Sequence, residues 1–171
     1  MTCPSVVRVG TLADWNEVWR LTLMAHHENG GPFSVDMEKS RYFIQRALAP
    51  QMIDPRDAGP RGVIGVIGPS EKLEGLVVLF IGSYWYSAQQ HLEEFIVFVD
   101  PECRKSLHAR TLIKWMKRQS DLTGIPLLTG VLANNRTEAK VKLYDRMLPR
   151  AGAFFLYGVK GATAASSAAF A

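Results

Sequence analysis

The segment 93–116, EEFIVFVDPECRKSLHARTLIKWM, combines residue types that could do chemistry. Two carboxylates open it, an apolar run follows, and the run breaks at Asp100 and Pro101 before a basic helix. The first amides of a helix lack partners within the helix, and with the helix dipole they form a site for an anion, usually a phosphate. Four residues around the turn add further donors: Arg104, Lys105, Ser106 and His108. The segment therefore predicts an anion site between a strand and a helix, with a solvated basic helix start as the alternative.

Helix and strand signals alternate along the chain, which indicates an α/β or α+β protein built around one mixed sheet. Strands are expected at 6–9, 63–67, 76–81, 91–99, 127–132 and 154–157. Helices are expected from Thr11 to Asn29, after a cap at Ser34, from near Leu107 to Gly124, and from Arg136 to Met147. The second helix should turn four residues towards the core: Met37, Ile44, Ala47 and Leu48.

The composition is that of an ordinary globular protein, with 47% apolar and 21% charged residues. Its 171 residues predict one domain over 1–160, followed by a flexible tail over 161–171. The net charge of +4 suits an anionic partner but decides little. Two cysteines without paired spacing argue against a disulfide framework. No apolar run approaches the roughly 20 residues of a membrane helix, and we see no signal peptide, so we expect a soluble cytoplasmic protein.

The turn resembles the acetyl-coenzyme A signature of the GNAT N-acetyltransferase superfamily, which reads Val-x-Pro-x-x-Arg/Gln-x-x-Gly-x-Gly/Ala between a strand and a helix. Val99, Pro101, Arg104 and Ala109 stand at matching positions, and Leu107 replaces the first glycine. Because backbone amides hold the phosphates, this departure weakens the match without abolishing it.

The second half of the chain agrees with the same family. Asn134 and Asn135 follow the strand at 127–132, and Leu143 and Tyr144 stand late in the next helix. By element order the resemblance covers residues 6–158, and its specific motifs lie within 93–144.

The resemblance implies a mixed, mostly antiparallel sheet flanked by about four helices, with a splayed strand pair that holds the cofactor. Acetyl-coenzyme A would be the co-substrate, and no metal is implied. Backbone groups of Val97 and Phe98 would bond the pantetheine and the thioester carbonyl, where an N–H would also stabilise the oxyanion intermediate. The cofactor contacts that it implies are Val97, Phe98, Val99, Arg104, Lys105, Ser106, Leu107, His108, Ala109, Arg110 and Asn135.

The resemblance also implies a base and an acid. A lysine-like amine has a pKa of about 10.4 and must lose a proton before it attacks. Glu93 and Glu94 are the candidate bases, and strand alternation places them on opposite faces, so that only one can face the cleft. Glu94 is our preferred choice. Tyr144 matches the acid of the family and would protonate the departing thiolate. The structural alternatives are solvated carboxylates at a strand entrance, a core tyrosine, and a helix cap at Asn135.

The expected function is therefore direct transfer of an acetyl group from acetyl-coenzyme A to an amine of a small molecule or a protein. A catalytically silent module that binds coenzyme A or another ligand is the first alternative, made plausible by Leu107. A nucleic-acid-associated protein is the second, and it rests only on the basic stripe of Arg110, Lys114 and Lys117.

The acceptor amine carries no signature in the sequence. We expect its cleft to involve the first two helices and the loop 82–90, with at least one of the aromatic residues Tyr84, Trp85 and Tyr86. Neighbouring histidines at 26 and 27 point about 100° apart on a helix, so we expect no metal there. A membrane partner is not expected, and a homodimer is left open.

Overall fold

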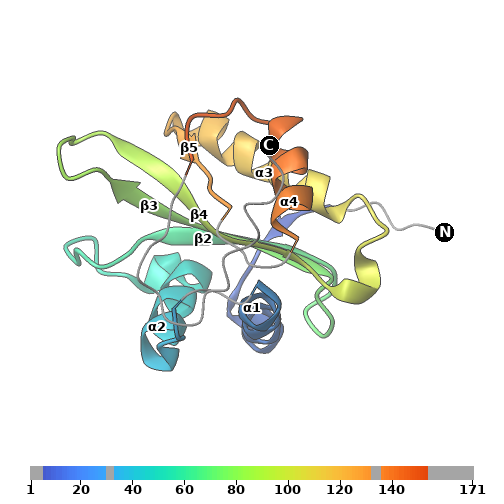
Figure 1. Ribbon diagram of the computed structural model, residues 1–171. Helices are drawn as coiled ribbons and strands as arrows, with labels where there is room; N and C mark the ends of the chain where they lie inside the picture. The colour runs from blue at the N-terminus through green and yellow to red at the C-terminus, as the bar shows by residue number, and fades with distance from the viewer. Residues whose placement is uncertain (1–5, 30–32, 132–135, 154–171) are drawn as a thin grey trace.

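The computed structural model describes residues 6–29, 33–131 and 136–153. At its centre is a five-stranded sheet in the order β1-β2-β3-β4-β5 (Figure 1). The strands are β1 (Arg8–Val9), β2 (Gly62–Ile67), β3 (Gly75–Ser83), β4 (Gln90–Val99) and β5 (Leu127–Leu128). Neighbouring strands are antiparallel except β4 and β5, which run parallel. This is the mixed, mostly antiparallel sheet that the resemblance implies.

Helices cover both faces of this sheet. The α-helices of the described residues are α1 (Trp15–Asn29), α2 (Met37–Leu48), α3 (His108–Thr123) and α4 (Thr137–Asp145). Short 3₁₀ helices lie at Leu12–Asp14, Pro50–Met52 and Pro101–Cys103. Figure 1 shows α1 and α2 on one side of the sheet and α3 and α4 on the other. None of the helices in the described part of the chain has the length and apolar character needed to cross a bilayer.

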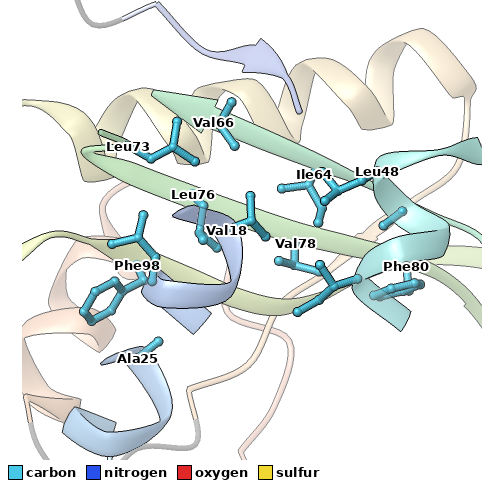
Figure 2. Packing of buried hydrophobic residues seen from close by; sticks show 13 residues of the cluster. Val18, Ala25, Leu48, Ile64, Val66, Leu73, Leu76, Val78, Phe80 and Phe98 are labelled. Atoms are coloured by element: carbon cyan, nitrogen blue, oxygen red, sulfur yellow. The ribbon is translucent and has the colours of Figure 1, made fainter. Parts of the chain in front are cut away.

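Strand β3 divides the core because its side chains alternate between the two faces. Leu76, Val78 and Phe80 point towards α1 and α2, and Figure 2 shows them packed beside Val18 and Leu48 of those helices. The intervening β3 residues pack against α3, whose buried residues are His108, Leu112, Ile113, Trp115 and Met116. Because both faces of β3 are buried, its run of apolar residues is nearly continuous.

The start of the first helix is tied to β1 by an ion pair between Arg8 and the buried Asp14. Asp14 is fully buried, and its carboxylate accepts hydrogen bonds from the Arg8 guanidinium at 2.6 and 2.8 Å. The Thr11 amide donates to the same carboxylate at 2.8 Å, as expected of a capping box. The Arg8 hydrogen bond holds the pKa of Asp14 well below its ordinary value. The predicted helix start at Thr11 is confirmed.

Three sequence expectations need correction. Asp36, not Ser34, caps α2, because its carboxylate accepts the Lys39 amide at 2.9 Å. Met37 then falls on the first helical position and is 41% exposed, so it does not face the core. The fifth strand has two residues where six were expected, because β5 separates from β4 after Leu128. The expected strand at 154–157 and the tail at 161–171 lie outside the described residues.

Candidate active site

An irregularity in β4 decides which of its side chains share a face. Consecutive residues of β3 pair with Glu94 and Ile96, so Phe95 is an extra residue on β4. Such a β-bulge shifts the alternation of side chains by one position. Glu94 and Val97, three residues apart, therefore both point to the face covered by α3 and α4. The bulge is what brings the candidate base to the helix that carries the candidate acid.

The two candidate bases lie on opposite faces, as alternation predicts. Glu93 pairs with Phe80, which belongs to the α1 and α2 side of the sheet, and its side chain is exposed. Glu94 lies on the other side and is part-buried beneath α4. Both carboxylates border the same open cavity, which is described below.

Glu94 and Tyr144 form a direct pair. The Tyr144 hydroxyl donates a hydrogen bond to Glu94 Oε2 at 2.7 Å. Burial raises the pKa of Glu94 to about 7, although the tyrosine hydrogen bond opposes this shift. Burial and the neighbouring carboxylate raise the pKa of Tyr144 well above its ordinary value. The pair therefore combines a carboxylate that can gain or lose a proton near neutral pH with a hydroxyl that stays protonated.

The strands β4 and β5 separate just beyond this point. They pair only at Leu92 with Leu127 and at Glu93 with Leu128. A cavity of about 840 Å³ opens where the pairing ends, bordered by residues 93–97 of β4 and by residues 128–131 after it. Its other walls come from α1, the segment 33–40 and α4. Beyond Glu93, the β5 side of β4 has no strand partner among the described residues, so its backbone groups can bond a ligand.

A second, smaller cavity of about 150 Å³ follows the strand, turn and helix singled out by the sequence. Residues predicted to contact the cofactor line it: Val97, Phe98, Val99, Arg104, Ser106 and Ala109. The opposite wall is α4. The two cavities share four lining residues: Asn29, Val97, Lys140 and Tyr144. They therefore meet beside the Glu94–Tyr144 pair.

The turn before α3 leaves most of its amides available. The helix begins at His108, one residue after the position expected. The Ser106 amide donates to the Cys103 carbonyl at 3.1 Å, so one of the four turn amides is used within the protein. Within the described chain, no hydrogen bond occupies the amides of Arg104, Lys105 or Leu107. The Leu107 side chain is 65% exposed and is not part of the cavity wall.

Solved structures with a similar arrangement of elements include several acetyltransferases. A predicted acetyltransferase from Clostridium acetobutylicum with acetyl-CoA has a TM-score of 0.68 at 9% identity, over 90% of this chain and 95% of that one. AAC(6')-Iy in complex with the bisubstrate analogue CoA-S-monomethyl-acetylneamine has a TM-score of 0.64 at 12% identity, over 91% and 98%. The ribosomal-protein-alanine N-acetyltransferase from Brucella melitensis biovar Abortus 2308 has a TM-score of 0.59 at 12% identity, over 91% and 100%.

The chain has the GNAT fold. No family model matches the sequence, and no curated protein does so either. The likeness thus lies in the three-dimensional arrangement of the elements.

Two side chains at the turn before α3, Arg104 and His108, form hydrogen bonds or ion pairs with distant parts of the protein. Arg104 forms an ion pair with Glu28 of α1, donates to the Val99 carbonyl at 3.3 Å, and lies over the Phe98 ring. His108 is buried, with Nε2 2.6 Å from a carboxylate oxygen of Glu74. Both side chains thus help to fix the turn, and their expected contacts with the phosphates stay a prediction. The backbone amides and the exposed residues 105 and 106 remain for a ligand.

Glu74, Cys103 and His108 form a cluster behind the turn. Their potential ligand atoms all lie within 4.8 Å of one another. Burial raises the pKa of the Cys103 thiol, and the Glu74 carboxylate adds to this effect, so the thiol stays protonated. The expectation that the protein uses no metal stays a prediction.

Lys140 is a site residue that the sequence reading missed. It lies on α4 one turn before Tyr144, on the same face of the helix, and borders both cavities. Burial lowers its pKa below the ordinary lysine value, and the carboxylates of Glu94 and Glu28 oppose this shift. Its spacing of four residues from Tyr144 is the signal that could have revealed it.

Other predicted residues lie away from this junction. Arg110, Lys114 and Lys117 border a separate basic cavity of about 540 Å³ beside Arg146. The aromatic residues 84–86 lie in the β3–β4 connection and border neither of the two adjoining cavities. Their expected place in the acceptor cleft stays a prediction. Asn135 lies outside the described residues.

Proposed function

We propose that the protein is an N-acetyltransferase that transfers the acetyl group of acetyl-coenzyme A to an amine. The observation that carries this proposal is the meeting of two cavities beside a hydrogen-bonded carboxylate and tyrosine. One cavity follows the strand, turn and helix start of the cofactor signature. The other is open to solvent and large enough for a second substrate. Val97, Lys140 and Tyr144 belong to both, so the two substrates would react there.

The smaller cavity suits the pantetheine arm, and the turn suits the pyrophosphate. The open edge of β4 from Glu94 onwards offers backbone groups to the pantetheine amides and to the thioester carbonyl. Amides of residues 104, 105 and 107 point into no protein acceptor and precede the N-terminus of a 16-residue helix, which favours a phosphate. An N–H aimed at the thioester oxygen would stabilise the oxyanion as the amine adds.

The Glu94–Tyr144 pair supplies a path for one of the two protons that the acceptor ammonium loses, and the other leaves the nitrogen to solvent as the amide forms. Glu94 takes a proton from the ammonium form of the acceptor, and the neutral nitrogen attacks the thioester carbonyl. The C–S bond of the tetrahedral intermediate then breaks, and Tyr144 protonates the sulfur. Glu94 returns its proton to the tyrosine oxygen along the 2.7 Å hydrogen bond. Because the raised pKa of Tyr144 keeps the hydroxyl protonated, the acid is ready before each turnover.

The larger cavity favours an acceptor that combines a positive charge with an apolar body. Glu93 and Glu94 place negative charge at its β4 wall, while Trp19, Phe33 and Phe95 provide aromatic surface. The comparisons agree with amine acceptors, since an acetylneamine analogue and a ribosomal-protein alanine are named for two of the similar structures. Whether the amine belongs to a small molecule or a protein is decided by the screen below.

The test uses cofactor binding and turnover together. Calorimetry with acetyl-coenzyme A measures binding, and a panel of amines is screened for thiol release. We expect Tyr144→Phe to keep cofactor affinity and to lower turnover by about 10²–10⁴-fold, the usual contribution of a positioned acid. Tyr84→Phe, in the β3–β4 connection, is the matched control and should behave like the parent. Absence of cofactor binding rules out the proposal, whereas binding without turnover on any amine favours the silent module.

A further inference from the structure

Lys140 places a second amine at the point where transfer would occur. It borders the cofactor cavity and the acceptor cavity together with Val97 and Tyr144. Glu94, the base proposed for the acceptor, is close enough to influence the Lys140 ammonium. The requirements for an acceptor are therefore met by a side chain of the protein itself: a primary amine, a nearby base, and access to the thioester.

The surroundings leave this amine free to move. With the described residues, the Lys140 ammonium forms no hydrogen bond and no ion pair, although the charged groups of Glu28, Glu94, Arg104 and Arg136 surround it. A lysine side chain has several rotatable bonds and can turn towards either cavity. Burial lowers its pKa, so more of the amine is neutral than for an ordinary exposed lysine at the same pH.

We propose that Lys140 is a site of self-acetylation, and that it accepts the acetyl group of bound acetyl-coenzyme A when the acceptor cavity is empty. The inference rests on the proposed use of this cofactor. Holding the two reacting groups together makes the step effectively unimolecular, which gives Lys140 a large advantage over lysines that meet the thioester only in solution.

The step balances without a further reactant. The ammonium of Lys140 gives one proton to Glu94, and its nitrogen forms a bond to the thioester carbon. The C–S bond breaks, and the coenzyme thiolate takes the proton of Tyr144, which Glu94 then replaces. The nitrogen releases its second proton to solvent as the amide forms, so the products are an acetylated lysine, free coenzyme A and one proton, with no change of oxidation state.

The modification would change the site in two ways. It removes a positive charge from beside Glu94 and replaces a small ammonium with a neutral amide that carries an extra methyl group. Both cavities become narrower at Lys140, which borders them both. The acetylated protein should therefore transfer acetyl groups to an added amine more slowly, and an added amine should slow the modification by competing for the thioester.

The experiment is mass spectrometry of the full chain incubated with acetyl-coenzyme A and no acceptor, followed by peptide mapping. We expect one acetyl group on Lys140, formed about 100-fold or more faster than on Lys142, an exposed lysine of the same helix. Lys140→Arg should abolish this product, and Lys142→Arg should leave it unchanged. Free coenzyme A added in excess should slow the modification by displacing the donor.

Calorimetry on the same samples separates this inference from the proposed function. Cofactor binding without acetyl on Lys140 overturns self-acetylation and leaves the acetyltransferase proposal standing. Equal modification of Lys140 and Lys142 also overturns it, because that pattern is solution chemistry. Absence of cofactor binding removes the proposed function and, with it, this inference. Tyr144→Phe should slow the labelling of Lys140 without affecting that of Lys142.

Discussion

At the scale of single residues, the buried carboxyl of Glu94 makes the stability of the protein depend on pH. Its pKa rises from an ordinary 4.5 to about 7 in the folded protein because burial disfavours the charged form. Below a pH of 4.5 the carboxyl is protonated in both the folded and the unfolded protein, so its burial as a charge does not lower the stability. As the pH rises through the folded pKa, the buried group ionises and stability is lost.

Glu94→Gln should therefore stabilise the protein more at about pH 8 than at about pH 5, by at most about 3 kcal/mol for a shift of this size. Glutamine cannot ionise, and its amide oxygen can still accept the Tyr144 hydrogen bond. Urea denaturation at the two pH values measures the difference. Glu93→Gln, on the exposed side of β4, is the control and should show no such gain. If Glu94→Gln changed the free energy of unfolding equally at the two pH values, this carboxyl would not be desolvated in the native state.

The resemblance to the GNAT superfamily pointed to Glu94, Tyr144 and the turn, and the structure brings Glu94 and Tyr144 together. The bulge at Phe95 decides that Glu94 is the carboxylate that meets the tyrosine. This bulge depends on pairing with β3, so the local sequence did not predict it. The local sequence also missed the ion pair between Arg104 and Glu28, residues 76 positions apart. Contacts of this kind depend on how distant segments pack, which local patterns do not contain.

At the scale of elements, the start of α2 offers a direct comparison of two capping residues. Ser34 and Asp36 are both good caps by residue type. The structure selects Asp36, whose carboxylate accepts the Lys39 amide. Asp36→Ala should lower the free energy of unfolding by about 1 kcal/mol, the usual cost of losing a cap, while Ser34→Ala should leave it nearly unchanged. Chemical denaturation of both variants is the measurement, and the reverse ranking would contradict the observed helix start.

The long elements were predictable, and the length of the short strand β5 was not. Strands β2, β3 and β4 and helix α3 have strong periodicity and clear ends, such as Gly124 with a φ of 68° after α3. Strand β5 has the same apolar character over a longer stretch, yet it pairs with β4 over two residues only. Its early end creates the larger cavity. Intrinsic propensity therefore does not by itself set the length of such a strand, because pairing with its neighbour also decides it.

At the scale of the whole molecule, α2 borders no part of the cavity that we propose for the cofactor. Helix α2 packs on β2 and closes the core that Figure 2 shows. The cofactor cavity is bordered by β4, the start of α3 and α4, with Glu28 and Asn29 at the end of α1. A ligand in this cavity contacts segments far apart in the sequence. Its binding should therefore slow hydrogen exchange in the elements that border the cavity more than in the others.

Acetyl-coenzyme A should therefore raise the midpoint of thermal unfolding and protect a defined set of amides from hydrogen exchange. A ligand bound only by the native state stabilises it by about 2.7 kcal/mol at 100 times its Kd. Protection beyond this global effect should concentrate in the turn 104–107, the first turn of α3, the end of β4 and α4. Hydrogen exchange of the α2 and β2 amides should slow only by the amount that the higher global stability produces. Coenzyme A without the acetyl group should protect the turn equally, because the turn contacts phosphates. Added protection centred on α2, or a rise in midpoint with an unprotected turn, would place the cofactor elsewhere on the fold.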